Sequence, residues 1–291
     1  MFWRLYHARA LIALLCALLL PGALAQTNAA SSASPAIRSV SFARTAALSP
    51  DDQQKITQFL QQEDPGWVAK QPLDVLASFI KNAVLTTYQD RGYWRAKVSA
   101  NVTWVKGSNE SRQVDVLISA MDEGPQYSLK EIRLTGATVF PTGQLLGLVA
   151  IHPRDLMSRT KVEQGLDAMR ELYASRGYVA FAAIPRAELD DSAHTVMLDI
   201  TVQEDSPFRF GNLSTEGFDR TTNRALRQAW DQVRNQFYSA DKLRSLLGRS
   251  LALPPGADPL DYSVSNLDFD THTVDVLVSS PPATQAEKRE R

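Results

Sequence analysis

Short segments with alternating hydrophobic and polar positions recur three times along this chain. In the clearest of them, Val114, Val116 and Ile118 point one way. Asp115 between them and Ser119 after them point the other way, as in a strand with one buried face. Each such strand follows a polar turn and a second extended segment, so the pattern predicts three β-hairpins. The paired segments are 98–105 with 114–119, 182–189 with 196–202, and 262–269 with 274–278.

Upstream of each hairpin the hydrophobic positions change to a helical period. Leu76, Ile80 and Val84 are four residues apart and form one apolar stripe. A shorter helical segment precedes each stripe, and the first of these starts favourably at Ser49-Pro50. A short apolar strand comes before each pair of helices. The predicted helices are 50–60 and 73–88, 144–149 and 162–173, and 226–233 and 243–251, and the opening strands are 37–42, 129–134 and 208–213.

The repeated order of strand, helix, helix, strand, strand predicts an α+β fold. The two hairpin strands must be antiparallel, whereas the opening strand can return parallel to one of them through a right-handed crossover. We therefore predict three tandem β-α-α-β-β modules, each a three-stranded mixed sheet with two helices on one face. The predicted divisions are a signal peptide at 1–25, a flexible lead at 26–36, domains at 37–123, 124–206 and 207–280, and a polar tail at 281–291.

Internal repeats support this division. The segment Tyr-Gln-Asp-Arg-Gly-Tyr at 88–93 recurs 85 residues later as Tyr-Ala-Ser-Arg-Gly-Tyr at 173–178. Gly92 and Gly177 fall where a helix must stop, so we predict a positive φ at both, with structural roles for the flanking tyrosines. The third copy is degenerate, because Leu-Pro-Pro-Gly-Ala-Asp-Pro at 253–259 replaces this helix end.

The first 25 residues have the composition of a cleavable secretory signal. Arg4 and Arg9 flank the start of an apolar run, which Pro21 and the Ala23-Leu24-Ala25 triplet follow. An uncleaved membrane anchor is the alternative, but the run is shorter than the roughly 20 residues that cross a bilayer. Cleavage before Gln26 would remove Cys16, the single cysteine, and with it all thiol chemistry.

Composition and motifs argue against catalysis. Hydrophobic residues make up 44% and charged residues 22%, as in ordinary globular proteins. The net charge of −1, or −3 without Arg4 and Arg9, gives no reason to expect nucleic-acid binding. His152, His194 and His272 lie far apart without metal-ligand spacing, and neither a nucleophile elbow nor a phosphate loop is found. We predict no catalytic residue, metal, cofactor or small-molecule substrate.

Three segments together resemble the polypeptide-transport-associated, or POTRA, domain. They are the helix end 173–178, the strand Lys-Glu-Ile-Arg-Leu-Thr-Gly at 130–136 with Phe140 after it, and the strand 196–203 ending at Glu204. In that family such domains precede an outer-membrane barrel that assembles or exports outer-membrane proteins. The resemblance implies a periplasmic protein whose partners are outer-membrane polypeptides or a barrel protein. We expect no barrel within this chain, and membrane association only through a partner.

A binding site can be predicted from the sheet topology. Proline has no N–H for a ladder, so Pro185 places the second strand of the middle module at a sheet edge, where an extended segment can add by backbone hydrogen bonds. We predict that the first helix of each module forms the groove wall. Trp67 and Trp94 would add apolar contacts or pack in the core. The candidate site residues are Val98, Ala100, Val102, Trp104, Ala183, Pro185, Ala187 and Leu189.

Three functions remain open from the sequence. The first is a client-binding protein that uses these edges. The second is a rigid adaptor or spacer that docks on a separate barrel or complex. The third is a cell-division-type protein, in which one such module follows a membrane anchor. An enzyme is the least favoured alternative.

Overall fold

The computed structural model describes residues 36–105, 113–251 and 261–280. The predicted signal peptide, the polar tail and almost all of the flexible lead lie outside these residues. So do the predicted turn at 107–111 and the segment 253–259. The predicted domain boundaries therefore remain predictions.

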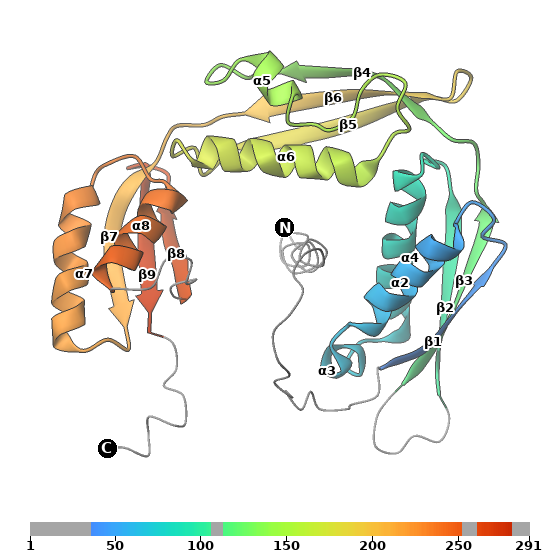
Figure 1. Ribbon diagram of the computed structural model, residues 1–291, viewed down its shortest axis with the longest axis horizontal. Helices are drawn as coiled ribbons and strands as arrows, with labels where there is room; N and C mark the ends of the chain where they lie inside the picture. Colours follow the sequence, from blue (N-terminus) through green and yellow to red (C-terminus); the bar gives the residue numbers. More distant parts are fainter. Residues whose placement is uncertain (1–35, 106–112, 252–260, 281–291) are drawn as a thin grey trace, which may run out of the picture. The chain divides into compact units, whose positions relative to one another are not determined.

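Within the described residues the strands form three sheets of identical topology (Figure 1). The closing strand lies in the centre of each sheet, with the opening strand parallel to it on one side and the other hairpin strand antiparallel on the other. The predicted α+β fold of three mixed sheets is confirmed. The first module contains β1 (Ile37–Ala43), α2 (Pro50–Gln61), α3 (Pro65–Val68), α4 (Leu73–Asp90), β2 (Lys97–Trp104) and β3 (Val114–Asp122). The second contains β4 (Ser128–Thr135), α5 (Thr142–Leu146), α6 (Arg159–Ala174), β5 (Ala182–Asp190) and β6 (Thr195–Gln203). The third contains β7 (Arg209–Glu216), α7 (Arg220–Val233), α8 (Ala240–Ser250), β8 (Asp261–Asp268) and β9 (Thr273–Ser279).

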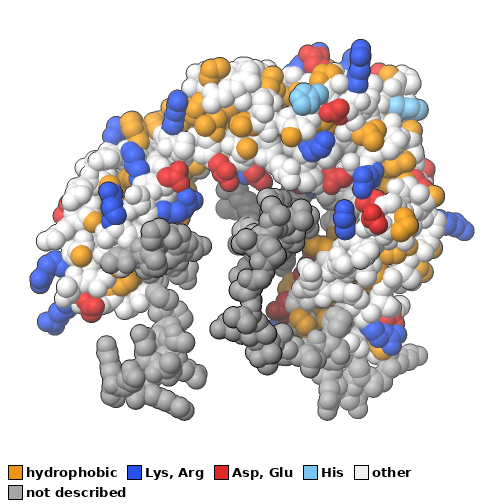
Figure 2. All heavy atoms as spheres, viewed as in Figure 1, with side chains coloured by type: hydrophobic (Ala, Val, Ile, Leu, Met, Phe, Trp, Pro, Cys, Tyr) orange, Lys and Arg blue, Asp and Glu red, His pale blue; other side chains and the backbone are white. Residues whose placement is uncertain are grey.

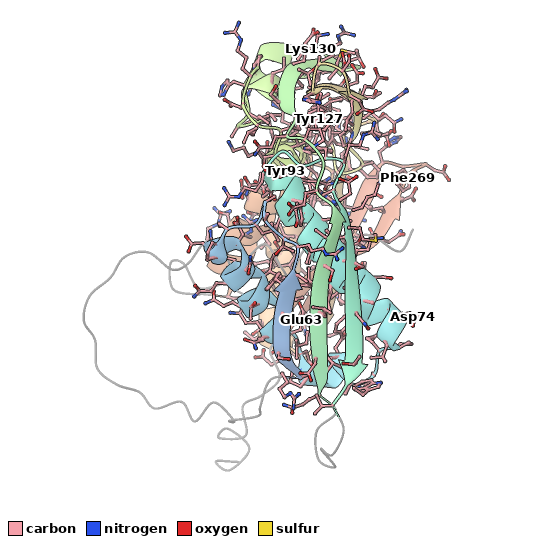
Figure 3. All side chains as sticks on the ribbon, turned by 90° about the vertical axis from the view of Figure 1, so that its right-hand side faces the viewer. Glu63, Asp74, Tyr93, Tyr127, Lys130 and Phe269 are labelled. Atoms are coloured by element: carbon pink, nitrogen blue, oxygen red, sulfur yellow. The ribbon has the colours of Figure 1, made fainter. Side chains whose placement is uncertain are left out.

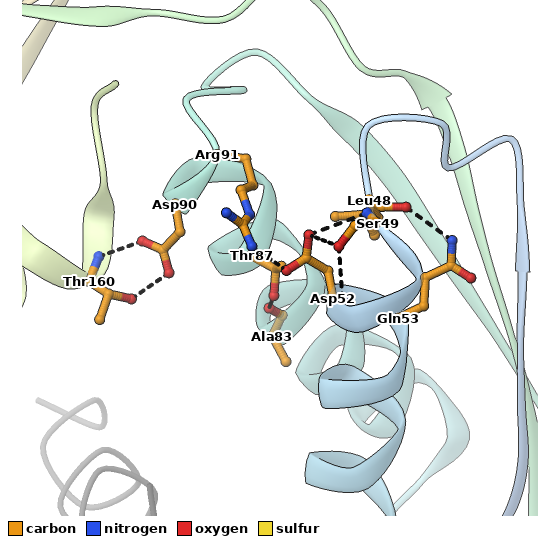
Figure 4. Close-up of polar contacts among 9 residues, drawn as sticks. All are labelled: Leu48, Ser49, Asp52, Gln53, Ala83, Thr87, Asp90, Arg91 and Thr160. Carbon is orange, nitrogen blue, oxygen red and sulfur yellow. Dashed lines mark hydrogen bonds and ion pairs between the residues drawn. The ribbon is translucent and has the colours of Figure 1, made fainter. Parts of the chain in front are cut away.

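The start of α2 shows how local sequence fixes a helix. Ser49 and Asp52 form a capping box, in which each side chain accepts a hydrogen bond from the other residue's backbone N–H (Figure 4). Asp52 is buried and also binds the Arg91 guanidinium at 2.7 Å, which joins the start of α2 to the end of α4. Burial alone would raise the pKa of Asp52, but the hydrogen bonds from Arg91 and Ser49 outweigh it and lower that pKa.

Both helix-end glycines have the predicted conformation. Gly92 has φ +85° and Gly177 has φ +89°, a region that residues with a Cβ rarely adopt. The N–H of Tyr93 reaches back to the carbonyl of Tyr88, which is fully buried. A Cβ on Gly177 would lie 2.9 Å from the carbonyl oxygen of Phe208. The glycine thus satisfies both the helix end and a close approach by the next module.

Each module has its own hydrophobic core between its sheet and its helices. The first core includes Leu76, Ile80 and Val84, the predicted stripe of α4. The third core is complete enough to bury Phe210 and Trp230, although the third module lacks the Tyr-x-x-x-Gly-Tyr helix end. Among the helices of the described residues, none is both long and apolar enough to span a bilayer.

Candidate functional site

The candidate site consists of the free edges of the first two sheets. Within the described part of the chain, β2 pairs with β3 alone and β5 pairs with β6 alone. Pro185 therefore lies on an edge strand, opposite Ile200. An edge of this kind leaves a row of backbone N–H and C=O groups without a neighbouring strand.

The register shows which backbone groups of β2 point outward. The N–H of Val105 donates to the carbonyl of Gln113 at 2.9 Å, so Val105 belongs to a hydrogen-bonded pair with the β3 side. Hydrogen-bonded and non-hydrogen-bonded pairs alternate in an antiparallel ladder. The intervening residues therefore direct their N–H and C=O groups away from β3. They are the four predicted site residues of this strand, Val98, Ala100, Val102 and Trp104.

The same reasoning applies to β5. Pro185 cannot donate to β6, which fits a non-hydrogen-bonded position whose backbone faces the free edge. The backbone N–H and C=O groups of Ala183, Ala187 and Leu189, at alternate positions from Pro185, also point away from β6. Pro185 thus removes one N–H from the middle of this edge. The β2 edge has no such interruption, because Ala100 stands opposite Ile118 at the equivalent place.

The side chains of most of these residues face the core rather than the solvent. Val98 is 2% exposed and Val102 is 6% exposed, and Ala100 and Trp104 pack against the same core. Ala183, Ala187 and Leu189 pack against the second core, whereas Pro185 is exposed. A partner at these edges would therefore contact backbone atoms first.

The prediction that the first helix of each module forms the groove wall is wrong. The second helix lies along the edge strand, α4 beside β2 and α6 beside β5 (Figure 1). The first helices, α2 and α5, lie beside the opening strands β1 and β4. Each helix covers the strand to which it is directly connected, so the chain order decides which helix borders which edge.

Neither candidate tryptophan is an isolated surface contact. Trp67 lies in α3, a helix not predicted from the sequence, and its ring meets the edge of Phe79 with centroids 5.2 Å apart. Trp94 packs against the second core, and its indole N–H donates to the carbonyl of Met157 at 3.1 Å. Both tryptophans therefore pack against a hydrophobic core, which is one of the two roles expected from the sequence.

Polar contacts that the sequence did not predict link the first module to the second. The Asp90 carboxylate, at the end of α4, accepts hydrogen bonds from the Ser158 hydroxyl at 2.9 Å and from the Thr160 backbone N–H at 2.7 Å (Figure 4). Ser158 is itself the N-cap of α6 and accepts from the Lys161 N–H, so Asp90 adds a second acceptor to the same helix start.

A second polar contact lies nearby. Asp191 binds the Arg95 guanidinium at 2.8 Å and the Tyr127 hydroxyl at 2.6 Å. Hydrogen bonds from Arg95 and then from Tyr127 lower the pKa of Asp191. Figure 3 shows Tyr127 close to Tyr93 where the two modules meet, and the backbone N–H of Tyr127 donates to the Gly92 carbonyl at 2.8 Å.

A tyrosine and a glutamate join the end of the second helix to the end of the closing strand in two modules. The Tyr88 hydroxyl donates to Glu123 at 2.7 Å, and the Tyr173 hydroxyl donates to Glu204 at 2.6 Å. Burial would raise the pKa of Glu204, but hydrogen bonds from Thr138, Tyr173 and the backbone of the loop after β4 lower that pKa to about 2. Both pairs support the structural role predicted for the tyrosines.

Two of the histidines occupy hairpin turns, and His152 lies in the loop before α6. His194 and His272 have φ +50° and +51° at equivalent hairpin turns, which fits repeat-equivalent turn residues. His152 is exposed, and its Nδ1 lies 3.6 Å from Oδ2 of Asp155. Among the residues that the structure describes, no group of histidines, cysteines or carboxylates has the arrangement of a metal site.

Comparisons with known proteins place this architecture in a known class. Residues 127–205 match the POTRA family model, described as surface antigen variable number repeat. The crystal structure of Haemophilus influenzae BamA POTRA3-5 has the same fold, with a TM-score of 0.61 and 20% sequence identity over 87% of this chain and 98% of that one. Residues 127–205 thus match the POTRA model by sequence, and the described modules share the fold of that POTRA3-5 structure.

One curated relative matches part of the chain. It is a Treponema pallidum (strain Nichols) protein assigned as an outer membrane protein assembly factor, 26% identical over 147 residues. The match covers 50% of this chain and 18% of that relative. This chain therefore corresponds to a small part of the length of that protein.

Proposed function

We propose that this chain is a non-catalytic periplasmic scaffold in outer-membrane protein assembly or export, and that it binds extended polypeptide segments by β-strand addition at β2 and β5. The POTRA match and the assembly-factor relative support the setting. One observation carries the binding mode: the outward backbone groups of both strands lie at sheet edges. Outer-membrane polypeptides or the strand of a barrel protein are the proposed ligands.

Edge addition suits a scaffold that handles many clients. Backbone hydrogen bonds contribute affinity with little demand on the sequence of the incoming segment, and alternate side chains of that segment face the bordering helix. We expect β2 to bind more tightly than β5, because Pro185 interrupts the β5 edge. The helix α4 beside β2 supplies the wall against which client side chains pack.

The equivalence of Ala100 and Pro185 provides a matched pair of variants. Ala100→Pro removes an outward N–H from β2 without removing a ladder bond, and Pro185→Ala restores one to β5. A single hydrogen bond contributes about 1 kcal/mol, so we expect Ala100→Pro to weaken binding about three- to tenfold and Pro185→Ala to strengthen it by a few fold.

The measurement is an NMR titration of the isotope-labelled chain with a ten-residue peptide of alternating valine and threonine. The proposal predicts amide shifts at 98–104 and 183–189. Unchanged β3 amide protection in Ala100→Pro controls for folding. Shifts confined to the helices, or equal affinities in all three proteins, would rule out edge addition.

A rigid adaptor between a partner and the outer membrane is the second candidate. The contact of Asp90 with the start of α6 favours it, because it ties consecutive modules together through side chains. An adaptor predicts one stoichiometric partner from an outer-membrane extract, whereas a client binder predicts many. Loss of that single partner in Ala100→Pro would assign it to β2.

A further inference from the structure

A row of arginines follows one face of the first helix of the third module. Arg220, Arg224 and Arg227 lie four and then three residues apart, so they share a face of α7. Among the residues that the structure describes, no carboxylate forms an ion pair with any of these three guanidinium groups. In Figure 2, Lys and Arg side chains gather along the α7 side of this module. This face of α7 is therefore basic over the segment from Arg220 to Arg227.

These arginines line an open groove on α7 that one strand residue, Thr215, borders. The groove has a volume of about 600 Å³ and lies between α7 and Thr215, near the end of β7. The Thr215 hydroxyl is hydrogen-bonded to Asn223, which fixes the strand against the helix at this point. Asp231 closes the far end of the groove, so its basic part extends over the first two turns of α7.

The strand that borders the groove is itself a sheet edge. Within the described residues β7 pairs with β9 alone. Its first half is covered, because the backbone of Phe210 exchanges hydrogen bonds with Asn235 and Gln236. In its second half the Glu216 carbonyl accepts from the Ser280 N–H at 2.9 Å, so Glu216 faces β9. By alternation Leu213 and Thr215 direct their backbone groups to the free edge, where the groove lies.

The corresponding edges of the other two modules lack this charge. Beside β1, helix α2 carries exposed Asp51 and Lys55 of opposite sign. Beside β4, helix α5 (Thr142–Leu146) has no charged residue. Among the described modules, the third therefore combines a free opening strand with a row of unpaired cations.

We propose that the free half of β7 and the arginines of α7 form a binding site for an extended polypeptide segment with acidic side chains at alternate positions. Alternate side chains on a strand are about 6.6 Å apart, close to the rise of about 6 Å between Arg220 and Arg224 on the helix. The backbone of the segment hydrogen-bonds Leu213 and Thr215 while its carboxylates meet the guanidinium groups. An anionic lipid surface would satisfy the arginines but leave the strand edge unused.

This site uses a different edge from the proposed function and stands independently of it. The probes are a ten-residue peptide of alternating valine and glutamate and its counterpart with lysine in place of glutamate, with binding followed by fluorescence anisotropy at low salt. We expect the glutamate peptide to bind at least tenfold more tightly. Replacing two exposed charges typically changes affinity by a few fold each, so Arg224→Gln with Arg227→Gln should weaken it about three- to tenfold.

The matched control is Lys242→Gln with Arg249→Gln on α8, which removes the same charge from the same module outside the groove. It should leave the affinity unchanged. Equal weakening in both double variants, or none in either, would overturn the proposal. Binding of phosphatidylglycerol vesicles that depends on Arg224 and Arg227, without peptide binding, would overturn it in favour of a lipid site.

Amide shifts separate this proposal from the proposed function. Shifts from the glutamate peptide at Leu213 and Thr215 support the arginine-lined edge. Shifts from either peptide confined to β2 and β5 would support edge addition there and contradict the site on β7.

Discussion

The two places where consecutive modules meet share a backbone arrangement but differ in their side chains. At the first, the Gly92 carbonyl accepts from the Tyr127 N–H at 2.8 Å; at the second, the Gly177 carbonyl accepts from the Phe208 N–H at 2.8 Å. The carbonyls of Tyr127 and Phe208 in turn each accept a backbone N–H, at 2.9 Å. The repeated helix end is thus also a repeated joint between modules.

Apolar side chains pack at both joints, Trp94 at the first and Val179 at the second, but the polar contacts described between modules lie at the first. There Asp90 accepts from the start of α6 and Arg95 pairs with Asp191. Ser175 and Ala180 take the places of Asp90 and Arg95 at the second joint, where Ala180 packs against the third core. The backbone joint therefore belongs to the repeat itself, whereas the polar contacts belong to one pair of modules.

The largest expected effect tests the shared backbone joint. Gly177→Ala forces a Cβ into a positive φ and against the Phe208 carbonyl, and Gly92→Ala does the same at 3.1 Å from the Tyr127 carbonyl. We expect each to lower the free energy of unfolding by about 2 kcal/mol, slightly more for Gly177. Urea unfolding measures the loss, and hydrogen exchange locates it.

Gly143→Ala is the control for these variants, because its Cβ would meet nothing within 4 Å and its φ is not positive. Because Gly143 lies in α5, alanine there should leave the stability unchanged or raise it by up to about 1 kcal/mol. A normal stability in Gly92→Ala or Gly177→Ala would show that the joint is not a constraint common to both places.

An intermediate effect tests the polar side of the comparison. Asp90→Ala removes an acceptor from the first turn of α6 but leaves the Ser158 cap in place, so we expect a loss of up to about 1 kcal/mol. The equivalent Ser175→Ala removes a hydroxyl that bonds within its own helix end and should cost much less. Hydrogen exchange of the first turn of α6 is the measurement. Equal losses in the two variants would contradict the difference between the joints.

The smallest effect concerns pH. Arg95→Ala removes the main cause of the lowered pKa of Asp191, so that pKa should rise toward its ordinary value in an NMR titration. Because the folded-state pKa lies below the unfolded one, the Arg95–Asp191 contact contributes its stability above the ordinary aspartate range and loses it as pH falls through the lowered pKa. An unchanged Asp191 pKa in Arg95→Ala would show that Tyr127 alone holds the carboxylate.

Periodicity was enough to predict the repeated fold. Strand alternation and helical stripes are local signals, so the order of elements and the positive φ of Gly92 and Gly177 followed from neighbouring residues. The helix α3 escaped this reasoning because four residues span little more than one helical turn and show no repeat. Asp90 and Thr160 are 70 residues apart, so no local sequence pattern indicates that the Asp90 carboxylate accepts from the first turn of α6.

The candidate site was predictable in part. Pro185 identified its strand as a sheet edge, and the strand order agrees. The bordering helix was assigned wrongly although the chain order indicates it, because α4 and α6 directly precede β2 and β5. The outward direction of the edge backbone follows from alternation once the hydrogen-bonded pair Val105–Gln113 is known.

The placement of the edge residues has an evolutionary consequence. The groups that would meet a client are main-chain atoms of residues such as Val98 and Val102, whose side chains hold the core together. Substitutions at these positions change the binding surface little, because they leave the main-chain groups in place. Their main effect is on the packing of the core. If the edges bind clients as proposed, selection on client preference acts through the flanking helices, or through the gain and loss of proline.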